Sequence, residues 1–255
     1  MMIYVFLFLL GAAVGSFLNV LIDRLPRKEG FLFGRSYCEN CRTPLPWFDL
    51  IPIFSFFWLR GRCRFCKTRI PLRLLVVEIL TGVGFVLLFW LGKDYHGLYY
   101  WLLITVYCLL FSSFIVLFFT DLEYGILPDR VVAPAMAATL VWRITPLVLN
   151  TRYWILPALG LALFFLFLIA ITRGRGMGFG DVKLGFLVGL VLGWPGTLVA
   201  AFLAFLLGGL VSAILLVVGR KHFGETVPFG PFLIIGTGIA VVFGSQIWSW
   251  YLSLL

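Results

Sequence analysis

The stretch WLLITVYCLLFSSFIVLFFTD runs from Trp101 to Asp121 and decides the class of fold. Its first twenty residues carry no charge, and about 20 apolar residues are what an α-helix needs to cross the hydrocarbon core of a bilayer. Asp121 closes the run. A carboxylate at the end of a lipid-embedded helix is costly, because apolar surroundings disfavour its charged form. The stretch therefore predicts a transmembrane helix and marks Asp121 as a candidate functional residue.

The composition places the whole chain in the membrane class. Of its 255 residues, 62% are hydrophobic and only 12% are charged, with a mean hydropathy of +1.07. Soluble domains carry about 25% charged residues. The N-terminal run from Met1 to Ile22 lacks a basic leading region and a clear small-x-small cleavage site, so it is expected to be a retained helix rather than a signal peptide.

Apolar segments long enough to cross a bilayer recur along the chain. They lie near 2–22, 74–92, 98–119, 131–149, 154–172, 197–219 and 230–252, with a half-length segment at 182–192. With the short segment included, we expect an all-α polytopic membrane protein of about eight transmembrane helices, both termini being on the same side. Its three parts are a first helix (1–22), a small loop domain (23–73) and a transmembrane core (74–255).

The basic residues predict the orientation. Eleven Lys and Arg lie between Arg24 and Arg73, and an eight-passage topology puts 17 of the 20 basic residues on that side, leaving Lys93, Arg143 and Arg152 opposite. The positive-inside rule then places both termini outside and the large loop in the cytoplasm. The net charge of +9 is a topology signal. It requires no nucleic-acid partner, and it predicts that the basic loop lies against anionic lipid headgroups.

The loop domain contains two cysteine pairs, Cys38/Cys41 and Cys63/Cys66, with 21 residues between them. Two CxxC pairs at such spacing can bring four thiolates onto one tetrahedral zinc ion, and a reducing cytoplasm argues against two disulfides. About 50 residues also bury too little core to fold well without a metal. A structural zinc site is the favoured prediction; redox or catalytic use and unliganded thiols are the alternatives. Cys108, alone in an apolar run, is expected to be a packing residue.

The connector between the two cysteine pairs is rich in proline and aromatic residues. Pro44, Pro46 and Pro52 predict an extended rather than helical chain from Thr43 to Pro52. The aromatic side chains that follow favour the membrane interface; they are Trp47, Phe48, Phe54, Phe56, Phe57 and Trp58.

A second carboxylate, Asp181, follows a glycine-rich run, Gly176-Met177-Gly178-Phe179-Gly180. Glycines permit positive φ and close backbone approach, so this segment can carry Asp181 against Asp121 and leave open backbone beside it for a substrate strand. Two such carboxylates on one face can share a proton and activate a water for peptide-bond hydrolysis. The run lacks the Gly-Lys-Ser/Thr ending of a nucleotide-binding loop.

The acids around Asp121 allow simpler interpretations as well. Asp129 follows Pro128 at an expected helix start, where an acid is favoured by the helix dipole. Glu123 is expected in the loop or as a helper, and Asp121 on its own would be an ordinary solvated acid at a helix end. The pairing with Asp181 is what favours a catalytic role.

With these residues in view, the chain resembles the type IV prepilin peptidases, bifunctional leader peptidase/N-methyltransferases of the aspartic GxGD class. The resemblance rests on motifs in order along the chain: Gly15-Ser16-Phe17-Leu18-Asn19-Val20 with Arg24-Leu25-Pro26, the cysteine pairs, Asp121-Leu122-Glu123 with Leu127-Pro128-Asp129, Gly178-Phe179-Gly180-Asp181-Val182-Lys183, and Pro228-Phe229-Gly230-Pro231-Phe232. One departure is Arg73-Leu74-Leu75, where the family commonly has Arg-Tyr-Pro before a glutamate. That glutamate, Glu78, is expected either to be paired for a functional or structural purpose, a basic residue being one candidate partner, or to snorkel to the interface.

The resemblance implies a bacterial inner-membrane enzyme that removes the basic leader of type IV prepilins or pseudopilins, the latter belonging to type II secretion, just after a glycine at the cytoplasmic face. It implies N-methylation of the new N-terminus with S-adenosylmethionine, and it makes Asp121 and Asp181 the catalytic pair with no metal in the proteolysis. Gly178, Gly180, Glu123, Asp129 and Lys183 are expected to shape the site. A transporter or proton channel using membrane-edge acids, and a zinc-knuckle scaffold without chemistry, are the rival classes.

Overall fold

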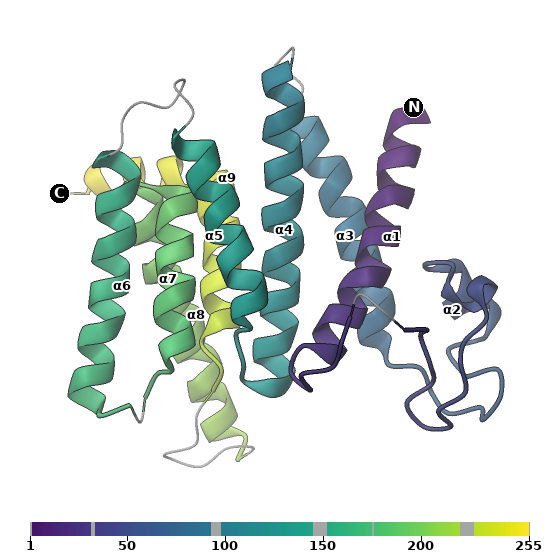
Figure 1. Ribbon diagram of the computed structural model, residues 1–255. Helices are drawn as coiled ribbons and strands as arrows, with labels where there is room; N and C mark the ends of the chain where they lie inside the picture. The colour runs from purple at the N-terminus through teal and green to yellow at the C-terminus, as the bar shows by residue number, and fades with distance from the viewer. Residues whose placement is uncertain are drawn as a thin grey trace. The chain divides into compact units, whose positions relative to one another are not determined.

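The computed structural model describes residues 2–31, 34–92, 98–144, 152–174, 176–219 and 227–254 (Figure 1). Lys93, Arg175, Arg220, Lys221 and the end of the expected 131–149 segment lie outside the described residues. The described chain is nearly all helical, and its β-structure is limited to two isolated bridges, Tyr37 with Pro44 and Arg62 with Arg69. The all-α class expected from the sequence is therefore confirmed.

Eight helices of 14 residues or more follow one another among the described residues, and two short ones lie in the loop domain. The long helices are α1 (Met2–Arg24), α3 (Leu72–Leu91), α4 (Leu98–Tyr124), α5 (Asp129–Ile144), α6 (Arg152–Thr172), α7 (Phe179–Leu192), α8 (Gly196–Val217) and α9 (Gly230–Leu252). The short ones are the 3-10 helix η1 (Trp47–Leu50) and α2 (Phe54–Trp58).

Six of the long helices among the described residues are long and apolar enough to cross a membrane: α1, α3, α4, α6, α8 and α9. The other two, α5 with 16 residues and α7 with 14, are shorter than a full crossing. The chain is a polytopic membrane protein, and the total of eight passages stays a prediction.

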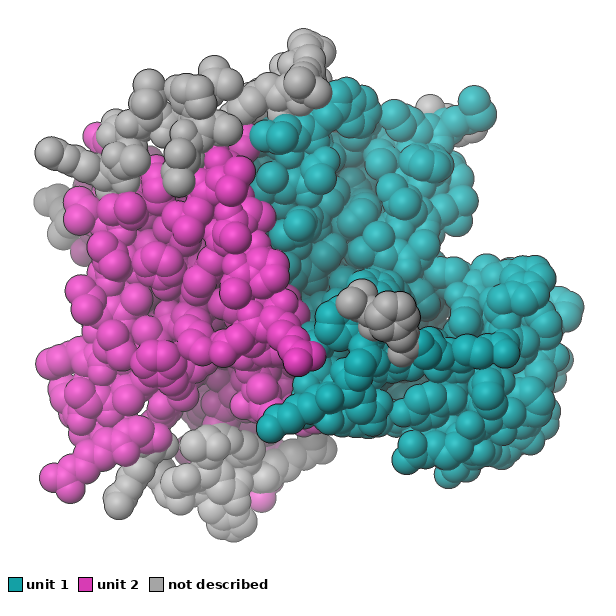
Figure 2. Space-filling model, in the orientation of Figure 1, with its two compact units in different colours: residues 1–116 teal, residues 117–255 magenta. Residues whose placement is uncertain are grey.

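Two compact units divide the chain, residues 1–116 and residues 117–255 (Figure 2). The first unit holds α1, the loop domain, α3 and most of α4. The second holds the C-terminal end of α4 and α5 to α9. The boundary falls inside α4, whereas the three-part division expected from the sequence has its boundaries at the ends of the loop domain; that division stays a prediction.

In the first unit α1 packs closely against α3 (Figure 1). A Cβ at Gly11 would lie 2.7 Å from the Thr81 carbonyl oxygen, and a Cβ at Gly15 would lie 2.8 Å from Glu78 Cα. Small residues four apart let two membrane helices approach backbone to backbone. The contact fixes the level of Glu78 opposite Gly15, in the interior of both helices.

The connector between the cysteine pairs is not extended throughout, so that expectation is wrong in part. Trp47–Leu50 forms one 3-10 turn, whose N-cap Pro46 is itself extended at φ −68° and ψ 154°. A helical turn that begins just after a proline loses no backbone hydrogen bond, because the missing N–H lies before the turn. Proline therefore sets where the turn starts rather than preventing it.

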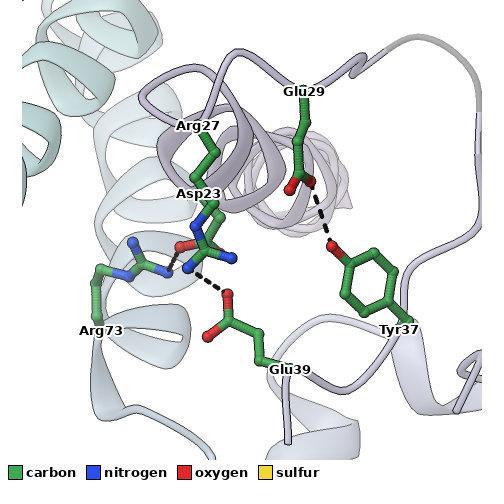
Figure 3. A network of polar contacts seen from close by, with 6 residues as sticks. All are labelled: Asp23, Arg27, Glu29, Tyr37, Glu39 and Arg73. Carbon is green, nitrogen blue, oxygen red and sulfur yellow. Dashed lines mark hydrogen bonds and ion pairs between the residues drawn. The ribbon is translucent and has the colours of Figure 1, made fainter. Parts of the chain in front are cut away.

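A network of polar contacts ties the end of α1 to the loop and to the start of α3 (Figure 3). Arg73 pairs with Asp23 at 2.6 Å and Arg27 pairs with Glu39 at 2.7 Å. The Tyr37 hydroxyl donates to Glu29 at 3.3 Å. The pair formed by Arg73 and Asp23 joins the first turn of α3 to the last turn of α1, so these charges mark one polar level on both helices.

In the second unit, α8 packs on α9, α6 packs on α7, and α5 also contacts α7. Phe165 of α6 is fully buried, and a Cβ at Gly185 of α7 would lie 2.6 Å from its ring. The same ring contacts Phe229, just before α9, with centroids 5.7 Å apart. This aromatic contact fixes the start of α9 against the α6–α7 pair.

Candidate metal centre and candidate active site

The two cysteine pairs fold as copies of one turn, which we call the first and second knuckle (residues 36–45 and 61–70). In the first, the Cys38 N–H donates to the Thr43 carbonyl at 3.0 Å and the Arg42 N–H donates to the Cys38 carbonyl at 2.8 Å. In the second, the Cys63 N–H donates to the Thr68 carbonyl at 2.9 Å and the Lys67 N–H to the Cys63 carbonyl at 3.1 Å.

The two knuckles also match in the hydrogen bonds at their ends and in their backbone angles. The Leu45 N–H donates to Ser36 and the Ile70 N–H donates to Gly61, each at 2.8 Å. Arg42 and Lys67, both four residues after the first cysteine of the pair, have φ of 57° and 59°. Each knuckle therefore presents its two sulfurs from the same backbone geometry.

The sulfur atoms of the four cysteines converge. All four Sγ atoms lie within 4.8 Å of one another, and Cys38 Sγ lies 3.7 Å from Cys66 Sγ. Four sulfurs at about 2.3 Å from a tetrahedral ion would be roughly 3.8 Å apart. The predicted four-cysteine cluster is confirmed, and it can hold a metal ion.

Thr68 supports the cluster from outside. Its hydroxyl accepts a hydrogen bond from the Asn40 side chain at 2.8 Å and lies 3.3 Å from Cys66 Sγ, so its own proton is available to a thiolate there. Hydrogen bonding at Thr68 lowers the pKa of the Cys66 thiol to about 5, and burial raises that of Cys38 to about 11. A metal ligand must be deprotonated, and Cys66 reaches that state most readily.

Arg64, between the two cysteines of the second knuckle, binds a carboxylate outside the cluster. Its guanidinium binds Asp49 at both carboxylate oxygens, with Nε at 2.9 Å from one and the terminal nitrogen at 2.6 Å from the other. It also lies 5.0 Å from the centre of the Phe48 ring. A planar guanidinium suits such a two-pronged contact; here it fastens η1 to the second knuckle.

The candidate active site lies in the second unit. Asp121 is in the last turn of α4 and is only 7% exposed. Its Oδ2 accepts a hydrogen bond at 3.0 Å from the backbone N–H of Gly230, the first residue of α9. The first N–H groups of a helix have no partner inside the helix and carry partial positive charge, so they favour a carboxylate. Asp121 is thus held by a segment 109 residues away.

Asp181 is held in a similar way by its own helix. It is the third residue of α7, is 8% exposed, and accepts a hydrogen bond at 3.1 Å from the N–H of Gly178. This is the carboxylate half of a capping box. Asp181 precedes the apolar part of α7 and lies outside the six candidate spans.

The two carboxylates share one neighbourhood. The pKa of Asp181 is raised to about 6: burial is the main cause, the hydrogen bond from the Gly178 N–H partly offsets it, and the negative charge of Asp121 adds to the rise. A Cβ on Gly230 would lie 2.6 Å from Asp121 Oδ2 and 3.4 Å from Leu184, one turn after Asp181. The structure therefore places the two predicted aspartates close enough for the charge of one to act on the other, with Asp121 and the first turns of α7 both beside Gly230.

Of the two roles expected for the glycines of the motif, positive φ and close approach, the structure shows only close approach. Gly178 has an ordinary extended backbone at φ −89°, and neither Gly178 nor Gly180 has positive φ. Gly180 allows close approach instead, since a Cβ there would lie 3.1 Å from Leu127. The glycine brings the start of α7 against the segment that joins α4 to α5.

The close contact of α7 with the α4–α5 segment also brings together two other predicted site residues, Lys183 and Asp129. Lys183 Nζ pairs with Asp129 Oδ1 at 2.6 Å, joining α7 to the first residue of α5, and it lies 5.5 Å from the centre of the Phe179 ring. Asp129 is therefore both a helix-start residue and an ion-pair partner. Glu123, expected in the loop or as a helper, lies in the last turn of α4 rather than in the loop, and it is exposed.

Comparison with known proteins identifies the family of the chain. Residues 9–91 match the bacterial peptidase A24 N-terminal domain, and residues 108–213 match the type IV leader peptidase family. The chain is 33% identical over 254 residues to a prepilin leader peptidase/N-methyltransferase of Bacillus subtilis, with 97% of each chain covered. The chain belongs to the type IV leader peptidase family.

Other members of the leader peptidase family show the same full-length relationship. The proteins of that name from Aeromonas hydrophila and Neisseria gonorrhoeae are each 30% identical, over 96% of this chain and 92% and 93% of theirs. No solved structure matches the chain. The family resemblance and the enzyme class expected from the sequence are confirmed, and with six candidate spans they indicate a multi-pass inner-membrane protein. The match gives no support to the transporter alternative.

Two residues that hold the candidate active site in place stand in one of the sequence motifs but were given no role there. Gly230 donates to Asp121, and Phe229 anchors that glycine, since its ring centre lies 5.0 Å from that of Phe205 and 5.7 Å from that of Phe165. The available signal was proline beside glycine at the start of the last apolar segment, which is typical of a helix N-terminus.

Glu78, in the first unit, pairs with no basic residue in any contact described, and it does not snorkel. It is 8% exposed, and its Oε2 accepts a hydrogen bond at 2.7 Å from the backbone N–H of Ile53. Ser16 of α1 is also a hydrogen-bond partner. The carboxylate thus serves the loop domain rather than a charge partner.

Proposed function

We propose that the chain is a membrane aspartic peptidase in which Asp121 and Asp181 form the catalytic pair. The observation that carries the proposal is that two buried carboxylates interact, each fastened by one backbone N–H at the start of a helix. Such fastening fixes their geometry and leaves the remaining oxygens for a water and a substrate carbonyl. A pair of this kind titrates as a unit and keeps one proton over a range of pH.

The chemistry needs one ionised and one protonated carboxyl group. The ionised group takes a proton from water while the water oxygen bonds to the scissile carbonyl carbon, and the protonated group donates to the carbonyl oxygen. Collapse of the tetrahedral intermediate breaks the carbon–nitrogen bond. The proton taken from water passes to the leaving amine, and a hydroxyl of the intermediate returns a proton to the carboxylate that had donated one as the carbonyl re-forms. The pair returns to its starting state, with no metal required.

The proposed substrate is the leader of a type IV prepilin or pseudopilin, as the names of the relatives indicate. Exposed acids beside the pair, Glu123 and Asp129, suit a basic leader. A Cβ at Gly178 would make only ordinary contacts, at 3.8 Å from Asp181 Oδ2 and 3.9 Å from the Gly180 nitrogen. A substrate glycine at the cleavage position, which has no side chain, suits a narrow slot beside Gly178 and Gly180. We place this site and the loop domain at the cytoplasmic face, with both termini outside, from the distribution of basic residues.

A second activity, methylation of the new N-terminus with S-adenosylmethionine, is proposed from the names of the relatives alone. The polar network at the end of α1 does not indicate a site for that cofactor, because its members pair with one another (Figure 3).

We propose zinc as the ion of the four-cysteine cluster. Thiolate ligands in tetrahedral arrangement suit zinc, and four protein ligands leave no open position for substrate, so the ion would stabilise the loop domain. The donor set is supported by the two matched knuckles and their converging sulfurs.

The test is incubation of the purified full-length protein with a prepilin, followed by mass measurement of the pilin N-terminus. Cleavage should remove the leader without added cofactor, and a further gain of one methyl group should require S-adenosylmethionine. An intact prepilin under conditions where the four-cysteine domain retains its metal would contradict the peptidase proposal. Cleavage without methyl gain would contradict the second activity alone.

A further inference from the structure

The aromatic hairpin of the first unit, residues 47–58, exposes large apolar side chains. Trp47 is 76% exposed, Trp58 70%, Phe57 64% and Phe54 58%. The rings of Phe54 and Trp58 stack on one another with centroids 5.8 Å apart. So dense a set of exposed aromatic residues marks an interaction surface rather than an ordinary loop.

The hydrogen bond to Glu78 gives the level of this hairpin along the membrane helices. Arg73 and Asp23 form the polar level at the first turn of α3, and Glu78 lies five residues further into that helix, about 7 to 8 Å deeper at 1.5 Å per residue. The Ile53 N–H is 2.7 Å from the Glu78 carboxylate. Side chains tilt toward the N-terminus of their helix, so the Glu78 carboxylate lies somewhat closer to the Arg73 level than the Glu78 Cα does. Figure 1 agrees, with α2 level with the C-terminal half of α1 rather than beyond its end.

Backbone at such a level needs hydrogen-bond partners from the protein, since lipid offers none. Ile53 is the N-cap of α2 and has φ 64° and ψ −54°, a conformation costly for a β-branched residue. The N–H of this N-cap residue donates to the buried Glu78 carboxylate. The contact accounts for an acid inside a membrane helix, because the carboxylate accepts the hydrogen bond that this turn would otherwise lack.

A basic hollow follows the hairpin directly. It has a volume of about 590 Å³ and is lined by Trp58, Leu59, Arg60, Arg62, Cys63, Arg64 and Lys67. Arg64 is engaged with Asp49, and the other three basic residues give the rim its positive charge. Aromatic side chains with cationic groups beside them match the boundary between acyl chains and anionic headgroups.

We propose that residues 47–58 form a re-entrant hairpin that inserts its exposed aromatic side chains into the leaflet where α1 ends and α3 begins. In this arrangement Glu78 anchors the turn from within the membrane. Arg60, Arg62 and Lys67 bind the headgroup of an anionic phospholipid. The proposal concerns the first unit and does not depend on the peptidase activity.

The experiment uses the full-length protein in nanodiscs that contain a phosphatidylcholine with a photoreactive diazirine in its acyl chain. Mass spectrometry maps the adducts. The hairpin should carry adducts at residues 54–58 as abundant as those on the lipid-facing sides of α1 and α3. Adducts on α1 and α3 with none on 54–58 would overturn the insertion and leave the aromatic surface for a protein partner.

Two variants test the anchor. Glu78→Leu removes the acceptor and should reduce labelling of 54–58 severalfold, while Glu78→Gln keeps an oxygen acceptor and should retain it. Unchanged labelling of α1 and α3 and unchanged metal content would show that both variants are folded. Equal labelling of 54–58 in the two variants would overturn the role of Glu78.

The headgroup part is tested by lipid composition. Labelling of 54–58 should be severalfold higher in nanodiscs of phosphatidylglycerol than in nanodiscs of phosphatidylcholine alone. The triple variant Arg60→Gln, Arg62→Gln, Lys67→Gln should lose that difference. If the unaltered protein were labelled equally in both lipids, the proposed binding of an anionic headgroup would be wrong.

Discussion

The two candidate sites of this chain are built in opposite ways. The four sulfurs come from two copies of one short turn, each closed by hydrogen bonds within ten residues. The two carboxylates lie 60 residues apart in the sequence, and one of them is held by a glycine 109 residues away. A site made of local turns depends on spacing alone, whereas a site made of helix ends depends on how α4, α7 and α9 pack. The two sites should therefore respond differently to mutation.

The sharpest test of this contrast is Asp121→Asn and Asp181→Asn, made separately. Each should reduce leader cleavage by 10³-fold or more, because an amide can neither accept the proton of water nor share one, and proton transfer alone contributes about 10² to 10⁴. Cleavage of purified prepilin is the measurement. Metal content should stay unchanged, since the cluster lies in the other unit.

Glu123→Gln changes an exposed acid two residues from Asp121 that we propose to attract the basic leader; it should raise KM a few-fold and leave kcat nearly unchanged, which separates substrate attraction from the chemistry. If either aspartate variant cleaved at the normal rate, the catalytic pair would be wrong.

The second test alters the four-cysteine cluster instead of the carboxylate pair, with the double variant Cys38→Ser, Cys63→Ser. It removes one ligand from each knuckle and should take the metal content from one zinc per chain to none by elemental analysis, because two sulfurs cannot hold the ion that four enclose. Loss of the ion should make the loop domain sensitive to protease and leave the Asp121–Asp181 geometry in place.

Cys108→Ser changes a cysteine of α4 outside the cluster and should keep the full metal content. Undiminished zinc in the double variant would refute the four-cysteine site. A complete loss of cleavage in it would mean that the two sites are not as separate as their construction indicates.

Gly230→Ala tests whether the carboxylate pair depends on distant packing. The new Cβ would lie 2.6 Å from Asp121 Oδ2, so the carboxylate must move or the N–H contact must lengthen. Misplacement of a reacting group by about 1 Å can cost 10²-fold, and we expect a fall in kcat of roughly tenfold to a hundredfold with KM little changed.

Gly238 lies on the same helix, and a Cβ there meets nothing within 4 Å. Gly238→Ala is therefore the matched control and should cleave normally. Equal rates for the two variants would remove Gly230 from the site.

The same contrast explains what the sequence could predict. The spacing of Cys38, Cys41, Cys63 and Cys66 was enough to predict the four metal ligands, because the hydrogen bonds that shape each knuckle join residues within that knuckle. Apolar length identified the membrane helices, and a carboxylate after an apolar run identified Asp121 as a candidate. The contact of Gly230 with Asp121 could not be read from the sequence, because it depends on where Phe229 packs against Phe165 and Phe205. The carboxylate of Glu78 was likewise ambiguous, since its partner is the backbone of a loop.

The smallest expected effect belongs to the ion pair of Lys183 and Asp129, which also joins two helices but lies at the surface. The Asp129 side chain is 69% exposed and that of Lys183 35%, and exposed pairs contribute only about 0.2 to 1 kcal/mol. Lys183→Met and Asp129→Asn should each change kcat/KM less than about fivefold. The double variant should be no worse than the poorer single one, because either change already breaks the pair.

Arg130→Met removes a neighbouring exposed charge and is the control for general electrostatics near a basic leader. If Lys183→Met instead abolished cleavage while Arg130→Met did not, the lysine would act on the substrate or on the carboxylates and not through Asp129. If the loss in the double variant equalled the sum of the losses in the two single variants, Lys183 and Asp129 would likewise act independently of each other. The packing of α5 against α7, rather than this surface pair, would then be what keeps the start of α7 and Asp181 in place.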